Sequence, residues 1–526
     1  MTAWPRRGPT ATGLLALAAL IWVLDGGPAA AAPRASQPAA PSSWTVYHGA
    51  ADGVGVAGAM AAVNTASPAW TSPALDGELY GEPLVSSGHV YVATENDTVY
   101  ELSAATGAVL WSTHLASPVP SGDLPCGDIA PTVGITGTPV IDPARGEIFV
   151  VADELVNGKS AHVFAGLSTA SGKVEVTQDV DPAGADPTAL LQRTGLTLDD
   201  GRVVFAMGGN DGDCASYRGR VIAEAETGGT PAMFTVDAAA GESQGAIWMG
   251  GAAPVVDSAG DILVTTGNGS VYSYRQPYDN SDSILELSPS LRLAQFFAPT
   301  TWATDNSRDL DMSTAPALLP DGQVILTGKS RIVYLLNQAH LGGIGGQQAE
   351  LGPACSADID GGVAVQGMTV YLPCTSGIVA VRAVKSPAAL HLLWSSGTGG
   401  GPPIVAAGLV WTIGQNGMLY GMDPATGAVR QQASIGVPAN HFPSPSAADG
   451  LLLAPSADQV VAFAAAAHAP TTNPTPAPSG VAASNAGSGS SAGGVLPVAA
   501  IAIAVGVVGV LVVIGAAFWL GRRRRT

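Results

Sequence analysis

The sequence is short of charge, and most of all of positive charge. Charged residues make up 12% of its 526 residues, and 22 lysines and arginines stand against 41 aspartates and glutamates. The formal net charge of −19 argues against binding to nucleic acid, which needs a basic surface, and against lying flat on anionic lipid. No long amphipathic helical pattern occurs between residues 60 and 466. The 67 glycines and 39 prolines are instead typical of a turn-dense all-β protein.

Motifs for metals, haem and nucleotides are missing or lie in the wrong context. The eight histidines form no HxH or HExxH pair, and no CxxC or CxxCH motif occurs, so neither zinc nor haem is expected. Gly53–Gly58 matches GxGxxG outside any strand–helix–strand unit, and Gly241–Gly245 matches GxSxG before a strand rather than a helix. Asn210–Asp213 begins like a calcium loop but lacks its final glutamate, which favours an acidic surface turn.

Both ends of the chain carry the marks of export and membrane attachment. Residues 1–32 predict a signal peptide, with Arg6 and Arg7 before the apolar stretch Gly13–Leu24 and a small-residue cleavage region at Ala29–Ala32. The twelve-residue apolar stretch is too short to span a bilayer. General export and twin-arginine export both remain open as the route.

The C-terminal end predicts a single membrane crossing. Val495–Leu520 is apolar and uncharged over a length that crosses a bilayer, and the basic residues 521–526 follow as a cytoplasmic tail. Residues 467–494, rich in Pro, Thr, Ser and Gly, predict a disordered stalk. We therefore expect a single-pass protein of the cell membrane, with an extracellular or periplasmic body and a cytoplasmic C-terminus.

The body between the two ends is built from repeats. Residues 81–115 read as four short strands separated by turn signals, at Pro83–Val85, Val90–Thr94, Thr98–Leu102 and Val109–Thr113. Eight such units follow one another at a spacing of about 40–50 residues, which is typical of propeller blades. We therefore predict an all-β, eight-bladed β-propeller over residues 44–466. A seven-bladed ring is the main alternative, because the third and sixth units are degenerate.

The eighth unit is incomplete, and the start of the chain supplies what it lacks. Pro443–Ala464 holds three strands, and Ala69–Pro73 resembles the last strand of the first unit without preceding strands of its own. We predict that the strand around Trp70 pairs with Gln459–Ala464. This pairing closes the ring and leaves no exposed sheet edge there.

The repeat resembles that of the pyrroloquinoline-quinone (PQQ) repeat family over roughly residues 44–466. The closest matches are Val90–Val92 with Thr106–Trp111, and Leu419-Tyr420 with Thr426-Gly427. The family includes quinoprotein alcohol dehydrogenases, which are eight-bladed and bind PQQ with calcium. It also includes propellers without cofactor or enzymatic activity, such as the outer-membrane assembly lipoprotein BamB. The resemblance thus implies the fold and leaves the activity open.

The resemblance also implies candidate site residues. Asn268 matches a calcium ligand, Lys329 a quinone contact, and Asp311 the catalytic base, while Trp248 lies about two residues from the place of the tryptophan under the quinone. Two departures oppose an enzyme. One cysteine, Cys126, stands where the dehydrogenases have two adjacent ones, and Cys214 stands where they have a calcium-ligand glutamate. Asp213 beside it is the substitute metal ligand to consider.

Four cysteines in an exported body, at 126, 214, 355 and 374, predict two disulfides with three connectivities open. Cys355 and Cys374 flank adjacent strands of the sixth unit, which favours a bond between them. The resemblance places Cys126 and Cys214 on the same central face and so implies the second bond.

Two functions follow from these residues. The first is a binding or scaffold module without cofactor, which presents the propeller face to a protein or small-molecule ligand. The alternative is a membrane-anchored alcohol dehydrogenase that uses PQQ and Ca²⁺.

Overall fold

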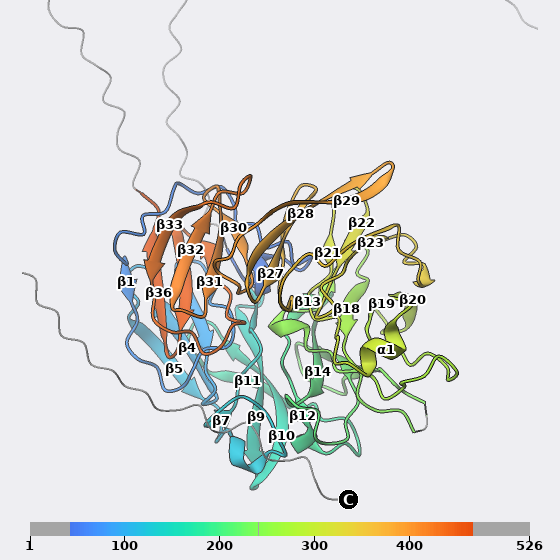
Figure 1. Ribbon diagram of the computed structural model, residues 1–526. Coiled ribbons are helices and arrows are strands. Elements are labelled where there is room, and N and C mark those ends of the chain that lie inside the picture. Colours follow the sequence, from blue (N-terminus) through green and yellow to red (C-terminus); the bar gives the residue numbers. More distant parts are fainter. Residues whose placement is uncertain (1–42, 240, 467–526) are drawn as a thin grey trace, which may run out of the picture. The chain divides into compact units, whose positions relative to one another are not determined.

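Eight sheets, antiparallel apart from one edge pair, form the body of the protein in a computed structural model, which describes residues 43–239 and 241–466 (Figure 1). Each sheet is one blade of a propeller. The inner strands of neighbouring blades contact one another around the ring, for example β34 (Ser446–Ala448) with β2 (Leu84–Ser86), β2 with β8 (Val140–Asp142) and β26 (Ala364–Gln366) with β30 (Ile404–Ala406). The eight-bladed prediction is confirmed, and the seven-bladed alternative is wrong because the third and sixth units each form a complete sheet.

The strands of blades 1 and 2 alternate in direction and run outward from the axis in chain order. Blade 3 differs in that its first two strands both pair with the third, and blade 4 in that its outermost strand pairs parallel with its neighbour. Blade 1 holds β2 (Leu84–Ser86), β3 (His89–Ala93), β4 (Thr98–Ser103) and β5 (Val109–His114). Blade 2 holds β8 (Val140–Asp142), β9 (Glu147–Val156), β10 (Lys159–Ser168) and β11 (Val174–Asp179). Blade 3 holds β12 (Leu190–Leu191), β13 (Thr197–Asp199), β14 (Arg202–Gly209), β15 (Arg220–Ala225) and β16 (Ala232–Thr235). Blade 4 holds β17 (Val255–Val256), β18 (Ile262–Thr266), β19 (Ser283–Leu287), β20 (Leu293–Ala298) and β24 (Gly343–Ile344).

Blades 5 to 8 repeat this order with two exceptions. In the sequence, β24 comes before the last strand of blade 5 although it belongs to the sheet of blade 4, and β1 from the start of the chain completes blade 8. Blade 5 holds β21 (Ala317–Leu318), β22 (Gln323–Leu326), β23 (Val333–Asn337) and β25 (Ala349–Leu351). Blade 6 holds β26 (Ala364–Gln366), β27 (Thr369–Cys374), β28 (Gly377–Lys385) and β29 (Ala388–Ser395). Blade 7 holds β30 (Ile404–Ala406), β31 (Leu409–Gly414), β32 (Met418–Met422) and β33 (Val429–Ser434). Blade 8 holds β34 (Ser446–Ala448), β35 (Leu451–Ser456), β36 (Gln459–Ala464) and β1 (Trp70–Thr71).

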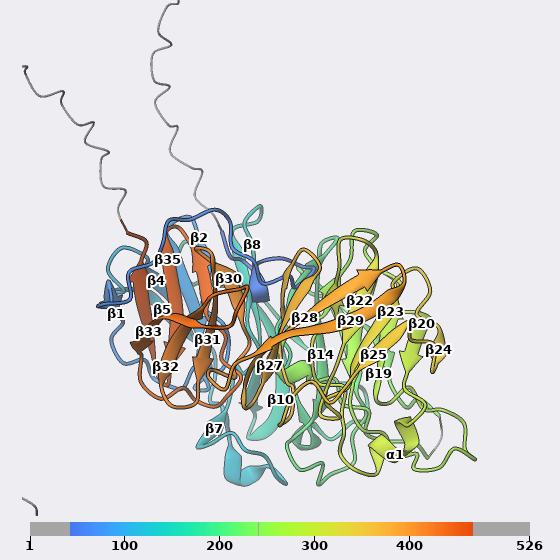
Figure 2. The same ribbon diagram turned by 45° about the horizontal axis from the view of Figure 1, so that its top comes forward.

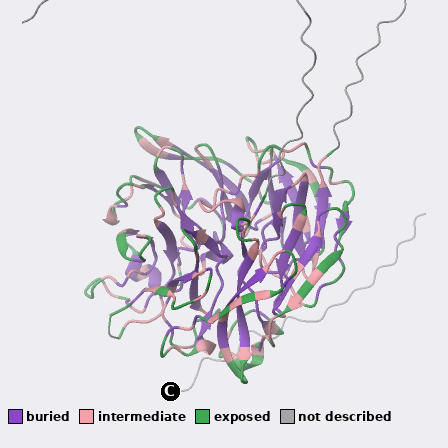
Figure 3. Ribbon diagram, turned by 180° about the vertical axis from the view of Figure 1, so that it is seen from behind, coloured by how far each residue is buried: buried purple, intermediate pink, exposed green. Residues whose placement is uncertain are grey.

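Short elements occupy the connections between blades. A two-stranded ribbon of β6 (Val119–Pro120) and β7 (Thr132–Val133) lies between blades 1 and 2, and α1 (Trp302–Asn306) lies between blades 4 and 5. Single 3₁₀ turns are η1 (Tyr47–Gly49), η2 (Ser121–Asp123), η3 (Pro187–Ala189) and η4 (Met249–Gly251). The inner strands are buried while the connecting loops and outer strands carry most of the exposed residues (Figure 3).

The ring closes as predicted. Trp70 pairs with Ala462, and Thr71 pairs with Val461, so β1 forms the outer strand of blade 8. Trp70 is 8% exposed, and its indole Nε1 donates to the carbonyl of Ala104 at 2.8 Å. The side chain therefore also binds blade 8 to blade 1.

This contact explains the Thr-Gly and Trp signature of the repeat. A Cβ on Gly107 would lie 2.4 Å from the Trp70 ring, and Gly107 adopts a φ of 71°. Trp111 packs on Gly172 and Trp394 on Gly427 in the same way, each with a 2.5 Å approach. The tryptophan of one blade thus lies on the glycine turn of the next, where any side chain would collide with it.

One end of the central channel is covered by residues 44–57, which we call the plug. Trp44 bridges to Val85 of blade 1 and Val56 to Val405 of blade 7, and between them the Ala51 carbonyl accepts from Val256 N of blade 4, so the plug follows the inner strands around the ring. Tyr47 and His48 of the plug are buried at 5% and 1% exposure. Figure 2 shows this blue segment along the upper side of the ring. The first two glycines of the GxGxxG match lie in the plug and have a packing role, since a Cβ on Gly55 would lie 2.8 Å from His48.

Both predicted disulfides are confirmed. Cys126 is bonded to Cys214 and Cys355 to Cys374, each with a Cα–Cα distance of 6.1 Å. Among the described residues, no helix is long and apolar enough to cross a membrane. The predicted signal peptide, stalk, membrane span and tail lie outside the described residues.

Candidate functional site

The predicted site residues come from loops at the end of the channel opposite the plug. Asn268 follows β18, Lys329 follows β22, and Asp311 lies between α1 and β21. The Lys329 ammonium lies 2.7 Å from Asp311 Oδ2 and 2.9 Å from Oδ1 of Asp309. The backbone N–H of Asn268 donates to Asp311 Oδ1, and its Nδ2 donates to Asp309 Oδ1, both at 2.8 Å. A loop of blade 4, a loop of blade 5 and the connection between these blades therefore meet around the Lys329 ammonium.

Glycines before two of these residues permit the close approach. A Cβ on Gly267 would lie 2.6 Å from Asp311 Oδ1, and a Cβ on Gly328 would lie 2.0 Å from the Asp311 backbone oxygen. The dipeptides Gly267-Asn268 and Gly328-Lys329 thus leave room for the Asp311 loop between them. Both residues, which the resemblance had singled out, therefore lie beside Asp311.

The charges of this cluster are strongly coupled. Burial alone would lower the pKa of Lys329. The carboxylates of Asp311 and Asp309 raise it by more than burial lowers it, so the net shift of this pKa is upward. Burial raises the pKa of Asp311, and Lys329 offsets part of that rise. With 19% of its side chain exposed, the ammonium is mostly removed from water. It therefore depends on these two carboxylates for its solvation.

Trp248 forms one wall of the site. The Lys329 ammonium lies 5.3 Å from the centre of the Trp248 ring, within the range of a cation–π contact. Phe442 meets the same ring edge-on, with the ring centres 5.9 Å apart. The structure therefore brings together four of the predicted residues, at positions 248, 268, 311 and 329.

Asp213 does not join the hydrogen bonds of this cluster. Its carboxylate accepts the Tyr217 hydroxyl at 2.6 Å. Burial raises the pKa of Asp213, and Asp309 raises it further while Lys329 lowers it, so it faces the cluster from a distance. Its neighbour Cys214 is held in the disulfide with Cys126.

The donors present do not fit calcium. A calcium ion takes six to eight oxygen ligands, whereas both oxygens of Asp311 are already bound by Asn268 N and the Lys329 ammonium. Among the described residues, Asn268 Oδ1 and Asp309 Oδ2 accept no hydrogen bond, which leaves two oxygens of this cluster available, too few for a calcium ion. No group of three His, Cys, Asp or Glu in the described part of the chain could hold a metal ion.

Sequence reasoning missed Arg193, which lies in the channel beside this wall. Its guanidinium carbon lies 4.8 Å from the centre of the Phe442 ring and 5.8 Å from that of Tyr80. The side chain is 6% exposed, and Nη2 has no hydrogen-bond partner among the described residues. An arginine two residues after the apolar pair Leu190-Leu191 was the available signal.

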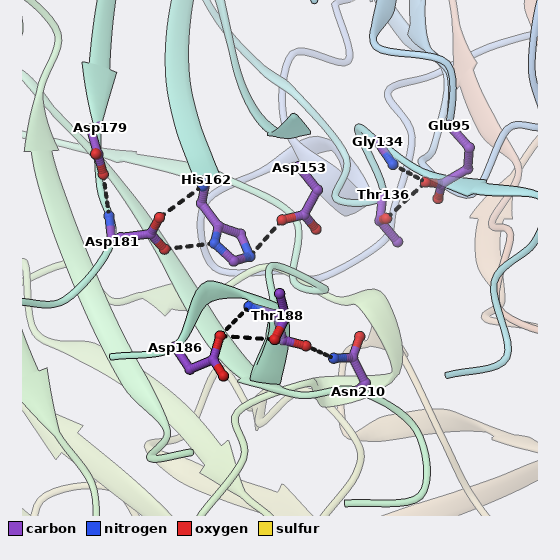
Figure 4. A network of polar contacts seen from close by, with 10 residues as sticks. All are labelled: Glu95, Gly134, Thr136, Asp153, His162, Asp179, Asp181, Asp186, Thr188 and Asn210. Carbon is purple, nitrogen blue, oxygen red and sulfur yellow. Dashed lines mark hydrogen bonds and ion pairs between the residues drawn. The ribbon is translucent and has the colours of Figure 1, made fainter. Parts of the chain in front are cut away.

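A second polar network lies around the buried His162 of blade 2 (Figure 4). His162 lies between Asp153 and Asp181, with Nε2 2.6 Å from one carboxylate and Nδ1 2.7 Å from the other. Burial would lower the pKa of His162, but the two carboxylates raise it to about 10. Because the side chain is 0% exposed, this imidazole cannot exchange protons with a ligand and serves the fold.

The comparisons with known proteins agree with this architecture. The family model described as "Outer membrane protein assembly factor BamB" matches residues 21–291. No curated protein matches the chain. The quinohemoprotein alcohol dehydrogenase ADHIIG of Pseudomonas putida HK5 superposes with a TM-score of 0.61 at 13% identity, over 83% of this chain and 82% of that one.

Two further solved structures share the fold. The quinohemoprotein alcohol dehydrogenase of Comamonas testosteroni has a TM-score of 0.60 at 15% identity, over 81% of this chain and 80% of its own. A europium-containing methanol dehydrogenase has a TM-score of 0.56 at 13% identity, over 80% of this chain and 98% of that one. These identities show the fold alone. The family model covers about half of the chain, and the chain belongs to the PQQ-repeat propeller family of the outer membrane protein assembly factor BamB.

Proposed function

We propose that this protein is a binding or scaffold module, a propeller held outside the cell membrane by the apolar segment 495–520. The observation that carries the proposal is the closed network around Lys329. Asp311, the residue in the place of a catalytic base, has both oxygens engaged by Asn268 N and the Lys329 ammonium. A base must have a free oxygen to accept a proton from substrate.

Two further contacts support the same proposal. The Lys329 ammonium lies over the Trp248 ring, in the space where a planar cofactor would stack. The disulfide Cys126–Cys214 ties the loop between blades 1 and 2 to the β14–β15 loop of blade 3, on the same face. Both contacts favour a rigid surface over a site that admits cofactor and substrate.

The chemistry of this face favours a partner with positive charge. Asp128, Asp211, Asp213 and Asp309 are exposed on its loops. Complementary charge speeds encounter and selects among partners. A protein or small-molecule ligand with basic groups is the occupant that these carboxylates suit.

The test is a titration of the full-length protein in detergent with PQQ and Ca²⁺, followed by absorbance, with an alcohol and dye assay beside it. We expect no binding at micromolar PQQ and no turnover. Sub-micromolar binding together with alcohol oxidation would overturn the proposal.

A quinoprotein dehydrogenase is the second candidate, and one observation favours it. The four residues that match the family site, Trp248, Asn268, Asp311 and Lys329, lie together although they come from distant parts of the chain. If the protein is such an enzyme, Asp311→Asn removes turnover while PQQ binding persists. If it is a binding module, neither wild type nor variant oxidises alcohol.

Membrane attachment is tested separately by fractionation. We expect the full chain in the membrane fraction and a chain that ends at residue 494 in the soluble exported fraction. Recovery of the full chain in the soluble fraction would contradict the tether without bearing on the site.

A further inference from the structure

The loop between β18 and β19 is the longest connection between the central strands of a blade in the described ring. It covers residues 267–282, and we call it the blade 4 loop. It belongs to the candidate-site end, since Asn268 is part of it and contacts Asp311 there. Figure 2 shows α1, on which this loop packs, at the end of the blades away from the blue plug. Loops of this length in a compact domain usually carry function.

Contacts within the loop and with α1 hold it in one shape. Asp279 Oδ2 accepts from Val271 N at 3.1 Å. The hydroxyl of Tyr278 donates to the Ser281 carbonyl at 3.2 Å. The Tyr278 ring lies edge-on to Trp302 of α1, with the ring centres 5.1 Å apart. A partner therefore meets a preformed surface and loses little affinity to ordering the loop.

Two tyrosines of this loop are more exposed than any other aromatic residue in the described part of the chain. Tyr272 is 55% exposed and Tyr274 is 56% exposed. The Tyr272 hydroxyl donates to Gln244 Oε1 at 3.3 Å, and the Tyr274 hydroxyl lies 2.9 Å from Thr304 Oγ1. Each ring is thus held at its polar end while more than half of the residue meets water. Rigid tyrosines of this kind are enriched in protein interfaces, because they bury a large area at a low entropy cost.

A guanidinium group without a carboxylate lies next to these rings in the chain. Arg275 directly follows Tyr274, is exposed, and forms no ion pair or side-chain hydrogen bond among the described residues. The nearby carboxylates are not free to pair with it, since Asp279 and Asp305 are buried and Asp309 is bound to the candidate-site ammonium. In a chain of net charge −19, such an arginine is an exception. A carboxylate on a partner would supply the missing counter-ion.

The charges of this end of the propeller are arranged in an order. Asp128 is exposed on the connection after blade 1, and Asp211 and Asp213 are exposed on the β14–β15 loop of blade 3. Arg275 lies on the next blade. A partner that matches both signs must carry its own charges in the complementary order, which fixes how it docks. A folded protein has such an order, whereas a polysaccharide repeats one charge along its length.

We propose that the blade 4 loop is the docking surface for an exported protein whose contact segment carries a carboxylate beside apolar side chains. The carboxylate pairs with the Arg275 guanidinium, and the apolar side chains cover the Tyr272 and Tyr274 rings. This inference rests on the proposed function, because it names the class of partner that the binding module takes.

The first test replaces Tyr274 with the photo-crosslinker benzoylphenylalanine in the full-length protein, in cells of its native host. We expect one dominant adduct with an exported protein, which mass spectrometry identifies. The matched control carries the crosslinker in place of Leu392, which is 49% exposed on β29 of blade 6, and should give no such adduct. Absence of a protein adduct at the Tyr274 position overturns the proposal. An adduct that resists protease, as a polysaccharide does, also overturns it.

The second test measures binding of the identified protein to variants of the full chain. Y272A/Y274A should weaken binding about thirtyfold, as expected for truncation at interface hot spots. Arg275→Glu should weaken it about tenfold at low salt, mainly through slower association. The matched control Arg292→Glu reverses an exposed arginine of the same blade in the β19–β20 turn, at the plug end, and should leave the affinity unchanged. Unchanged affinity in folded Y272A/Y274A, or tighter binding to Arg275→Glu, overturns the proposal.

These tests separate the docking surface from the proposed function. Alcohol turnover with PQQ and Ca²⁺ would overturn the binding module itself. Loss of the adduct without any turnover would overturn the docking surface alone.

Discussion

Loss of Trp70 should weaken the whole propeller and not one blade alone. β1 is two residues long, yet it completes blade 8 and joins it to blade 1. In Trp70→Ala the indole that covers the Gly107 turn is lost, and the Ala104 carbonyl loses its donor. Large-to-small changes at buried aromatic residues cost about 3–5 kcal/mol. This is a fifth or more of the stability of an ordinary domain, which is about 5–15 kcal/mol.

Trp111→Ala is the matched control. Trp111 makes the same kind of contact, with its ring against Gly172 and Nε1 donating to the Thr169 carbonyl at 3.0 Å. It joins blades 1 and 2, which the chain already links covalently. The side chain is half-buried, whereas Trp70 is 8% exposed. We therefore expect the smaller loss for Trp111→Ala.

The assay is thermal and urea unfolding of both variants, together with a deletion of residues 60–76. We expect Trp70→Ala to lower the melting temperature by roughly 5–10 °C, at about 2 °C per kcal/mol for a large domain. The deletion should cost more and promote association, because it exposes the edge of β36. An unchanged melting transition after the deletion would refute ring closure by β1.

Three other perturbations test the site and the core. Lys329→Met should destabilise the domain by about 2–4 kcal/mol, because it leaves Asp311 and Asp309 close together without a cation, and urea unfolding measures this loss. The double variant C126S/C214S should lose about 4–5 kcal/mol less any strain in the native state, from a closed loop of 88 residues, and a loss below 1 kcal/mol would contradict the chain-entropy estimate. Since the folded pKa of His162 is raised to about 10 from 6.5, its contribution to stability is full below pH 6.5 and is lost as the pH rises through 10. His162→Gln should abolish that decline between pH 7 and 10 in a series of melting curves.

Local sequence determined the strands, the ring and most of the candidate site. Period-2 patterns and Gly-rich turns are short-range signals, so the blades could be predicted. The strand at Trp70 could be assigned to blade 8 because a propeller must close, and the closed ring left one partner for it. Lys329 and Asn268 were found because each follows a Gly at the end of an apolar strand, a motif carried by the resemblance.

The rest depends on which loops the closed ring brings together. Arg193 contacts Phe442 across nearly 250 positions of sequence, and the plug crosses from β2 to β30. Neither arrangement leaves a periodic trace, because the first rests on a single side chain and the second on isolated backbone bridges to the inner strands. Asp309 was passed over for Asp311, yet it binds the same ammonium. The sequence by itself therefore determined the repeating sheets and their closure, while the tertiary structure decided the contacts inside the channel, where burial and unpaired charge select the partners.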